Sequence, residues 1–424
     1  MARTRARKPI RVGVFGLGRG RAFLGEAAAY AGFKVVALCD GSPLRLEHAS
    51  ALLSDSRPAT YTDFDAFLAH DMDAVVVTNY FHEHAPYAIR ALESGRHVFS
   101  ECQACHTPAE AVALVRAVEK SKRIYMFGEN YPYMKPNFEM ARLYRKGVIG
   151  EFHYGEGEYT YPHGPGASGL APGLKHWRNW IPATYYCTHA IAPVMFVTDT
   201  RPVQVNGFVT PYAPEQDDPA TRIKRADSVG LIVCKMDNGA YLKALQGNVT
   251  GGHTSFVRIH GTRGVMERPR ASGGPNMMVR LYLDHPARKN QPAEQFYVPR
   301  YGKYERLAAK TGHGGGDFFM CREFAEAIRR NEPPFLDVYR GVAMSLAGIL
   351  AYRSALQGST PLEVPDLHKE APRRRYAKDD WSPDPTRRRK GQPWPSITGR
   401  VVPTREAADK ANARWRKLGK FPGL

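Results

Sequence analysis

Short apolar runs alternate with longer, partly polar stretches over the first 127 residues of the chain. The runs lack a polar residue at every second position, which is typical of strands buried on both faces. They predict strands at 10–15, 34–39, 74–77, 97–100 and 124–127. The stretches between them predict helices at 23–31, 43–53, 84–94 and 108–121. Because strands and helices alternate, we expect an α/β domain with a parallel, doubly wound sheet of the Rossmann type.

The pattern changes after Asn130, where strand-like stretches alternate apolar with polar residues. A helix at 135–146, with Gly147 as its expected C-cap, precedes strands at 151–161, 203–212, 228–236, 240–248 and 255–260. Residues 237–239 have the Asp, Asn and Gly composition of a hairpin turn, so we expect a mostly antiparallel, open sheet. Two helices, at 317–330 and 342–357, complete an α+β domain, and a short helix is expected near 405–417. We therefore divide the chain into residues 1–130, 131–364 and a Pro- and Arg-rich tail, 365–424.

The chain carries a net charge of +19, and much of the excess lies in the tail. Residues 368–424 hold 16 Lys and Arg against 6 Asp and Glu. Prolines separate the basic runs, and we interpret these runs as solvated surface. A subunit contact or an acidic partner are the alternatives. No nucleic-acid partner is expected. No run of 18 apolar residues predicts a membrane span, and no apolar stretch typical of a signal peptide follows the basic N-terminus. The six cysteines are scattered, so we expect reduced thiols and a cytoplasmic location.

Strand 10–15 leads directly into a glycine-rich sequence, GLGRGR, at residues 16–21. At a strand-to-helix turn, glycines let the backbone approach a pyrophosphate, and the helix N-terminus supplies N–H donors. The third glycine stands one place early for G-x-G-x-x-G, so the motif alone would also suit a purely structural turn. Asp40 ends the second strand, where a carboxylate accepts the ribose hydroxyls and repels a 2′-phosphate, which favours NAD over NADP despite nearby Arg45. The cofactor residues expected here are Gly16, Gly18, Arg19, Gly20, Arg21 and Asp40.

Further motifs follow in order: a strand that ends in Thr78-Asn79, then His84, then the sequence ALESGRHV at 91–98, then Glu101. From about residue 11 to residue 362, this order resembles that of the Gfo/Idh/MocA oxidoreductases. The resemblance implies an NAD-binding Rossmann domain and a second domain whose open sheet covers the nicotinamide. In this family such a sheet commonly becomes a subunit interface, so a homo-oligomer is expected. The resemblance also implies NAD contacts at Asn79, Phe81, His84, Glu101, Gln103 and Asn130.

Two departures from that family concern its general base. Cys102-Gln103 follows Glu101 where the family's dehydrogenases have a lysine, and Tyr185 stands four residues before His189 where they have an aspartate. These departures resemble one branch, the NAD-dependent glycosidases of glycoside hydrolase family 109. The motifs that carry this resemblance, in chain order, are Glu129-Asn130, Gly157-Glu158-Tyr159, Trp177-Arg178, Tyr186-Cys187-Thr188-His189 and His313-Gly314-Gly315-Gly316-Asp317-Phe318. Residues 162–174 and the tail match no part of this series.

The chain has no convincing pair of carboxylates for direct displacement at an anomeric carbon. The resemblance implies another route: transient oxidation of the sugar at C3, loss of the C2 proton and the C1 leaving group, addition of water, and reduction. We expect four side chains to carry protons in this cycle: Tyr159, Tyr186, His189 and His313. His189, with Tyr186, is assigned to the C3 hydroxyl or the C2 proton, and His313 to the leaving group or water. The substrate-binding residues expected are Trp177, Arg178 and His253.

Two other functions stay open at this point. One is a conventional NAD-dependent sugar or cyclitol dehydrogenase with net hydride transfer, and the other is a non-catalytic protein that binds sugar and NAD. Cys102 and Cys105 form a single C-x-x-C, which lacks the second ligand pair of a zinc site, so no metal is expected. A small glycoside or sugar is the expected partner in each case, and no membrane partner is expected.

Overall fold

The computed structural model of the chain describes residues 8–54, 56–161, 169, 171–211, 220–249, 253–270, 277–286 and 292–419. The chain separates into two compact units. The first comprises Met1–Cys105, Glu110–Lys135 and Arg300–Val342, and the second comprises His106–Ala109, Pro136–Pro299 and Ala343–Leu424. Each unit is thus assembled from segments that are far apart in the sequence.

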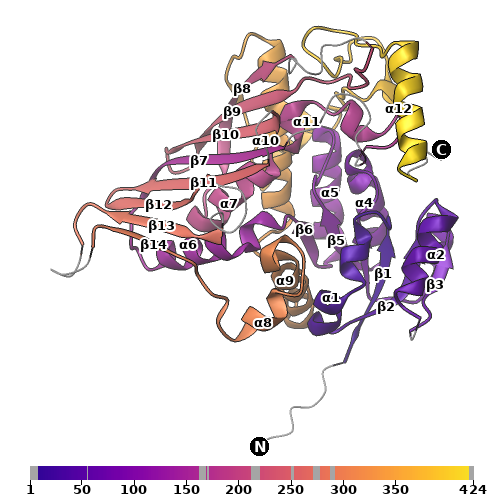
Figure 1. Ribbon diagram of the computed structural model, residues 1–424, viewed down its shortest axis with the longest axis horizontal. Helices are drawn as coiled ribbons and strands as arrows, with labels where there is room; N and C mark the ends of the chain where they lie inside the picture. The colour runs from indigo at the N-terminus through magenta and orange to yellow at the C-terminus, as the bar shows by residue number, and fades with distance from the viewer. Residues whose placement is uncertain are drawn as a thin grey trace, which may run out of the picture. The chain divides into compact units, whose positions relative to one another are not determined.

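A six-stranded parallel sheet, in the order β3-β2-β1-β4-β5-β6, forms the centre of the first unit (Figure 1). Its strands are β1 (Ile10–Phe15), β2 (Phe33–Cys39), β3 (Ala59–Tyr61), β4 (Ala74–Val77), β5 (His97–Glu101) and β6 (Tyr125–Gly128). The helices between them are α1 (Glu26–Ala31), α2 (Pro43–Ala51), α3 (Phe64–Leu68), α4 (His84–Glu93) and α5 (Pro108–Ser121). Chain order reverses between β1 and β4, and sheets of this kind bind their ligands at the carboxyl ends of such strands. The predicted doubly wound parallel sheet is confirmed.

The first helix begins later than the apolar pattern predicts. Residues Gly20–Phe23 form a 3-10 turn, and α1 starts only at Glu26, because Gly25 takes an extended N-cap conformation (φ -97°, ψ -159°). The pattern also does not predict β3 and α3, which have three and five residues. Elements this short do not complete a recognisable period.

Helix α9 (Gly316–Arg330) belongs to the first unit, although it follows the strands of the second unit in the sequence. It packs against α1, where the ring centroids of Tyr30 and Phe318 are 6.3 Å apart. Arg329 Nη2 donates a 2.8 Å hydrogen bond to the carbonyl oxygen of Ala31. A short helix, α8 (Glu305–Ala308), precedes α9. This return of the chain places residues 313–317 in the unit that carries the glycine-rich turn.

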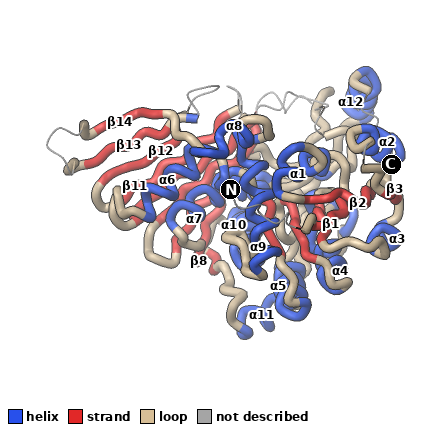
Figure 2. The backbone as a smooth tube through the Cα atoms, turned by 90° about the horizontal axis from the view of Figure 1, so that it is seen from below, coloured by secondary structure: helices blue, strands red, loops and turns tan. Residues whose placement is uncertain are grey.

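A nine-stranded sheet, in the order β14-β13-β12-β11-β7-β10-β9-β8-β15, forms the second unit. Its strands are β7 (Phe152–Tyr161), β8 (Pro202–Thr210), β9 (Val229–Met236), β10 (Tyr241–Asn248), β11 (Thr254–Gly261), β12 (Gly264–Arg268), β13 (Val279–Leu283), β14 (Glu294–Tyr297) and β15 (Leu362–Glu363). Every neighbouring pair is antiparallel except β7 and β10. Figure 2 shows β11 to β14 as a run of neighbouring strands. The predicted, mostly antiparallel sheet is confirmed, with the turn at residues 237–239 between β9 and β10.

Helix α7 (Thr188–Thr198) lies against β7 at unusually short range. A Cβ atom added at Gly157 would lie 1.9 Å from the carbonyl oxygen of Ala190, so only glycine permits this approach. The sequence pattern does not predict α7, since every residue of the helix is buried and no polar face repeats with the helical period. Pro193, inside the helix, further obscures it. Further helices are α6 (Lys135–Arg145), α10 (Val338–Leu356), α11 (Glu370–Tyr376) and α12 (Arg405–Lys417).

The C-terminal tail folds onto the second unit. Trp415 of α12 is fully buried against Ile223, with Leu174 packed alongside. The Ser396 hydroxyl donates a 2.6 Å hydrogen bond to Asp227 Oδ1. The part of the chain that the structure describes contains no helix long and apolar enough to span a bilayer.

Candidate cofactor and substrate sites

The glycine-rich turn lies where β1 ends and is tied to the neighbouring strands. Gly16 has φ +92°, and a Cβ atom there would lie 2.4 Å from the backbone nitrogen of Asn79. At Gly18 an added Cβ would meet nothing within 4 Å, so the backbone is open on that side. At Gly20 it would lie 2.7 Å from Val14 Cγ1. Although Gly20 stands one place early for the usual motif, it still performs the packing role of the third glycine.

Asp40 closes this turn with both carboxylate oxygens. Oδ2 accepts the Leu17 N–H at 2.7 Å, and Oδ1 accepts the Ser42 N–H at 2.9 Å. The side chain is almost fully buried, and Arg45 Nη1 lies 3.6 Å from Oδ2. The turn and the end of β2 are therefore held in one arrangement, with a carboxylate beside the open backbone of residue 18.

An ion-pair network runs from the glycine-rich turn to α9 within the first unit. Arg19 Nε pairs with Glu101 Oε1 at 2.7 Å, and Arg19 Nη2 pairs with Asp317 Oδ1 at 2.9 Å. His313 Nδ1 lies 3.1 Å from both carboxylate oxygens of Asp317. Burial would raise the pKa of Asp317, but His313 and the Arg19 guanidinium hold that pKa well below its usual range. Asp317 therefore stays ionised and orients the imidazole of His313, which is partly exposed. Exposed Arg21 lies two residues beyond Arg19.

His84, by contrast, is buried and contacts the backbone of two loops. Its Nδ1 lies 3.2 Å from the carbonyl oxygen of Gln103, and its Nε2 lies 3.3 Å from that of Asn79. Burial lowers the pKa of His84 to about 4, so the ring is neutral and does not serve as a proton carrier near pH 7. Phe81, in the 3-10 turn between β4 and α4, is also buried.

Two buried amide oxygens favour a polar ligand beside this turn. Within the described residues, Oδ1 of Asn79 and Oδ1 of Asn130 have no hydrogen-bond partner. Leaving such an oxygen unsatisfied costs about 1–3 kcal/mol, so a ligand that donates to it gains that energy. Together with the open backbone at Gly18 and the carboxylate of Asp40, these atoms fit a dinucleotide.

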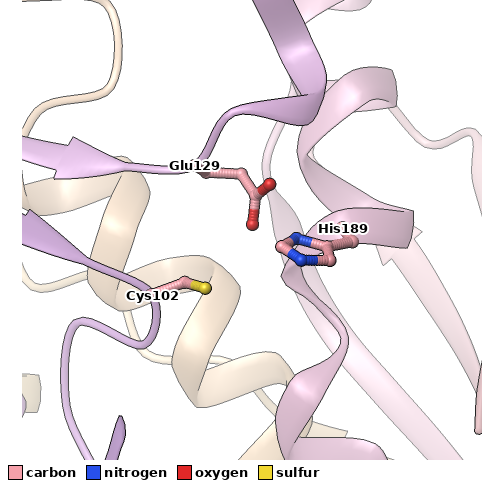
Figure 3. A group of neighbouring side chains, drawn as sticks. All are labelled: Cys102, Glu129 and His189. Carbon is pink, nitrogen blue, oxygen red and sulfur yellow. The ribbon is translucent and has the colours of Figure 1, made fainter. Parts of the chain in front are cut away.

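The position of the family's lysine holds Cys102, on the loop after β5. The thiol of Cys102 and a carboxylate oxygen of Glu129, which follows β6, lie within 4.8 Å of one another. Figure 3 shows both side chains. The third side chain in Figure 3, His189, belongs to α7 of the second unit. The first unit thus presents a thiol and a carboxylate where the family's dehydrogenases present an amine.

An aromatic cluster lies at one end of β7 in the second unit. The Tyr159 ring makes a T-shaped contact with His189, at 4.5 Å between centroids, and lies 5.9 Å from Tyr186. Tyr186 and His189 are 4.8 Å apart. His253 contacts Tyr159 edge to face at 5.2 Å, and burial lowers its pKa. The structure therefore brings three of the four predicted proton carriers together, while the fourth, His313, belongs to the first unit.

Arg178 borders this cluster from the 3-10 turn Trp177–Asn179. Its guanidinium carbon lies 4.3 Å from the Trp177 ring centroid and 5.2 Å from that of Tyr186. Burial alone would lower the pKa of Arg178, but Tyr186 and Tyr161 raise it overall. A guanidinium stacked on aromatic rings has N–H groups left to donate to hydroxyl or carboxylate oxygens.

The sequence analysis missed several residues of both sites. Gln246 on β10, in the amide orientation that satisfies both its oxygen and its nitrogen, donates 3.0 Å hydrogen bonds to the carbonyl oxygens of Tyr186 and Tyr159. The role of Asp317 could have been predicted from its spacing, since it stands four residues after His313 at the start of a helix. Lys224 had no sequence signal, because it lies between His189 and His313, where the motif series has no member.

Two domain models match the chain. Residues 10–129 match the NAD-binding Rossmann fold of the oxidoreductase family Gfo/Idh/MocA, and residues 231–372 match the C-terminal domain of glycosyl hydrolase 109. The chain combines a Gfo/Idh/MocA Rossmann domain with a glycosyl hydrolase 109 C-terminal domain. The resemblance inferred from the motifs is confirmed, and the Rossmann domain binds NAD.

Curated relatives and solved structures agree with this assignment. The glycosyl hydrolase family 109 protein of Saccharopolyspora erythraea is 27% identical over 404 residues, covering 85% of this chain and 84% of that protein. A protein of the same name from Shewanella amazonensis is 27% identical over 402 residues, covering 84% of this chain and 85% of that one. Levoglucosan dehydrogenase in complex with NADH superposes with a TM-score of 0.72 at 20% identity, covering 85% of this chain and 100% of the other. The last comparison supports the fold alone.

Proposed function

We propose that this chain is an NAD-dependent glycoside hydrolase that oxidises its sugar transiently at C3. The observation that carries the proposal is the cluster of Tyr159, Tyr186 and His189, bordered by Arg178. Cys102 stands where the family's dehydrogenases have a lysine, so the proton chemistry falls to phenol and imidazole groups. The names of the curated relatives agree with this assignment.

The first unit supplies the redox group. We assign the glycine-rich turn, Gly16 to Arg21, to the pyrophosphate and Asp40 to the adenosine ribose. Asn79 and Asn130 would donate to or accept from the rest of the cofactor through their buried amides. Bound NAD would accept a hydride from the sugar and return it at the end, so that no NADH accumulates.

The second unit handles the protons. His189 takes the proton of the C3 hydroxyl as that carbon is oxidised, with Tyr186 beside it as a second carrier. Tyr159, acting as the phenolate, then accepts the C2 proton, which the neighbouring ketone has made acidic, and the C1 leaving group departs with the C–O electron pair. Water adds at C1 and the same proton returns to C2. Trp177 and His253 shape the pocket, and Arg178 donates to sugar oxygens.

His313 is assigned to the leaving group and to water. Asp317 fixes the orientation of its ring, as the carboxylate of a catalytic His–Asp pair does. The imidazolium protonates the departing oxygen, and the neutral ring then accepts a proton from the incoming water.

A sugar dehydrogenase with net hydride transfer is the second candidate. It is favoured by the fold of levoglucosan dehydrogenase, whose complexes contain NADH and levoglucosan. In that case the protein would release a ketone and NADH and would cleave no glycosidic bond.

One assay separates the candidates. The full chain is incubated with a panel of 4-nitrophenyl glycosides and sub-stoichiometric NAD, and both 4-nitrophenol and NADH absorbance are followed. Release of 4-nitrophenol over many turnovers without NADH supports the hydrolase. NADH in proportion to substrate, without 4-nitrophenol, supports the dehydrogenase. Neither signal, with NAD bound, would indicate a non-catalytic binder.

Two variants test the assigned residues. Tyr159→Phe and His189→Ala should each lower turnover at least ~100-fold, because a positioned proton carrier contributes about that much, and neither should change NAD affinity. Tyr154→Phe is the matched control, since Tyr154 lies on the same strand but outside the cluster, next to Glu156. Turnover close to that of the parent in both Tyr159→Phe and His189→Ala would remove the assignment.

A further inference from the structure

A second cation, Lys224, lies beside Arg178 in the second unit. The segment that carries it crosses the neighbouring 3-10 turn, where the Arg225 N–H donates a 2.6 Å hydrogen bond to the carbonyl oxygen of Asn179. Lys224 Nζ itself donates to Asn248 Oδ1, at the end of β10. Asn248 Nδ2 in turn donates to the carbonyl oxygen of Tyr161, 3.3 Å away at the end of β7. Lys224 is therefore held at the strand ends that carry the aromatic cluster.

The charges around Lys224 are mostly positive. Arg178 and Arg222 both lie close enough to act on it, and the Arg222 Nε donates to the Lys224 carbonyl oxygen at 3.3 Å. Asp227 is the one carboxylate, among the described residues, that acts on Lys224 from nearby. The described part of the chain forms no ion pair with either Arg178 or Lys224 at salt-bridge distance.

Asp227 is already engaged by the tail. Its Oδ1 accepts the Ser396 hydroxyl at 2.6 Å, and its Oδ2 accepts the Ile397 N–H at 2.9 Å. Burial raises the pKa of Asp227 to about 6, so the tail contacts stabilise a carboxylate that the interior disfavours. Trp415 packs on Ile223, directly before Lys224. The tail thus fixes the segment 223–227, and among the described residues no carboxylate pairs with the ammonium of Lys224 at salt-bridge distance.

We propose that the sugar bound in the second unit carries a negative charge, a carboxylate or a sulfate ester, which Lys224 and Arg178 bind together. This inference rests on the proposed function only in taking the ligand to be a sugar. Arg178 and Lys224 act on one another as like charges, and an anionic group that accepts hydrogen bonds from both would offset that repulsion. A neutral sugar would leave the two cations facing each other without a shared counter-charge.

The charge of Lys224 depends on pH within the working range. Burial, together with Arg178 and Arg222, lowers the pKa of Lys224 to about 8, and Asp227 opposes that effect. The ammonium is therefore charged at pH 7 and loses its proton as the pH rises through 8. Affinity for an anionic sugar should fall over the same interval, while affinity for a neutral sugar should not.

Calorimetric titration of the full-length protein, saturated with NAD, tests the proposal. The probes are D-glucuronate, D-glucose 6-sulfate and D-glucose, each at pH 7 and pH 9. At pH 7 we expect at least one anionic probe to bind ten times or more tightly than D-glucose, and the anionic group of that probe identifies the class. At pH 9 the preference should shrink by threefold or more.

Three variants assign the preference to this side chain. Lys224→Met should lower the preference below about threefold without changing the affinity for D-glucose or NAD, and Lys224→Arg should restore it at pH 9 as well as at pH 7. Lys410→Met is the matched control, since Lys410 is an exposed lysine of α12 paired with Glu406. If Lys224→Met fails to fold, the parent chain and Lys224→Arg still give the probe and pH comparisons.

Two results would overturn the inference: D-glucose bound as tightly as both anionic probes, or an undiminished preference in Lys224→Met. Either would leave the proposed hydrolase function intact. Binding of no sugar at all would count against both proposals, and the glycoside panel would then show whether catalysis survives.

Discussion

At the scale of single residues, Asp317 links the glycine-rich turn to His313. Its carboxylate accepts from Arg19 and from the His313 ring, and Arg19 reaches Glu101 at the same time. Arg19 and Glu101 were expected to contact NAD, yet their side chains are engaged with one another. Arg19 thereby joins the glycine-rich turn to the end of β5 and to α9.

Asp317→Asn should destabilise the protein and impair His313. The free energy of unfolding at pH 7 should fall by roughly 2 kcal/mol, less than the ~3–5 kcal/mol of a fully buried broken pair, because Arg19 keeps Glu101. Glycoside turnover should drop by at least ~30-fold, because the imidazole loses its orienting carboxylate. Urea unfolding and 4-nitrophenol release measure the two effects. NAD affinity within threefold of the parent would confirm that the turn itself survives.

The sign of the pH dependence follows from the lowered pKa of Asp317. Stabilisation by the ionised carboxylate is complete at pH values above the pKa of Asp317 in the unfolded chain, near 3.9. It is lost as the pH falls toward the lower pKa that Asp317 has in the folded protein. The difference in unfolding free energy between the parent and Asp317→Asn should thus be constant from about pH 5 to 8 and should shrink below about pH 4. A difference that grows on acidification would contradict this account.

At the scale of elements, the approach of α7 to β7 positions two of the proposed proton carriers. Tyr159 lies on β7 and His189 at the start of α7, and their contact depends on the short distance that Gly157 permits. Gly157→Ala should lower the free energy of unfolding by about 3 kcal/mol, because the added methyl meets a backbone carbonyl. Turnover should fall with it as His189 moves away from Tyr159. Gly41→Ala, where an added Cβ meets nothing within 4 Å, is the control and should stay within ~0.5 kcal/mol of the parent.

Trp415 is the one large side chain that α12 buries. Trp415 is fully buried against Ile223, so Trp415→Ala should cost about 3 kcal/mol locally and release the tail from the second unit. Limited trypsin digestion should then cut within residues 387–417 at least ten times faster than in the parent. Leu418→Ala, at an exposed residue three positions further along the chain, should leave the cleavage rate unchanged. Unchanged cleavage in Trp415→Ala would show that other contacts hold the tail.

Elements with a clear period were predictable from the sequence, and those without one were not. Strands β1 and β4 and helix α5 have the predicted bounds, because each has a continuous apolar run or one apolar face. Helix α7 was missed because it is buried all round. In the same way, motif order predicted Tyr159, Tyr186 and His189 as one set, whereas Lys224 depends on a fold-back of the tail that no local pattern encodes.

At the scale of the whole molecule, the chain leaves the first unit and returns to it. Residues 300–342 pack with the Rossmann sheet after all the strands of the second sheet except β15 have been formed. Sequence patterns identify α9 as a helix but carry no information about which sheet it joins, because its apolar face would suit either. The assignment of His313 to the first unit therefore required the tertiary structure.

The same unit links NAD binding to the stability of the fold. A ligand that binds only the folded state stabilises it by about 2.7 kcal/mol at one hundred times its Kd, so Tm should rise with the logarithm of NAD concentration.

Asp40 should make the rise in Tm larger for NAD than for NADP, since its buried carboxylate repels a 2′-phosphate. In Asp40→Ala, the Kd for NADP divided by the Kd for NAD should fall at least tenfold. The reason is that Arg45, 3.6 Å from Asp40 in the parent, then faces the 2′-phosphate. The double variant Asp40→Ala, Arg45→Ala should lose that gain for NADP. Shifts are compared within each variant, because Asp40 also accepts the Leu17 and Ser42 N–H groups and its loss lowers Tm by itself. Equal shifts with NAD and NADP in the parent chain would refute the role given to Asp40.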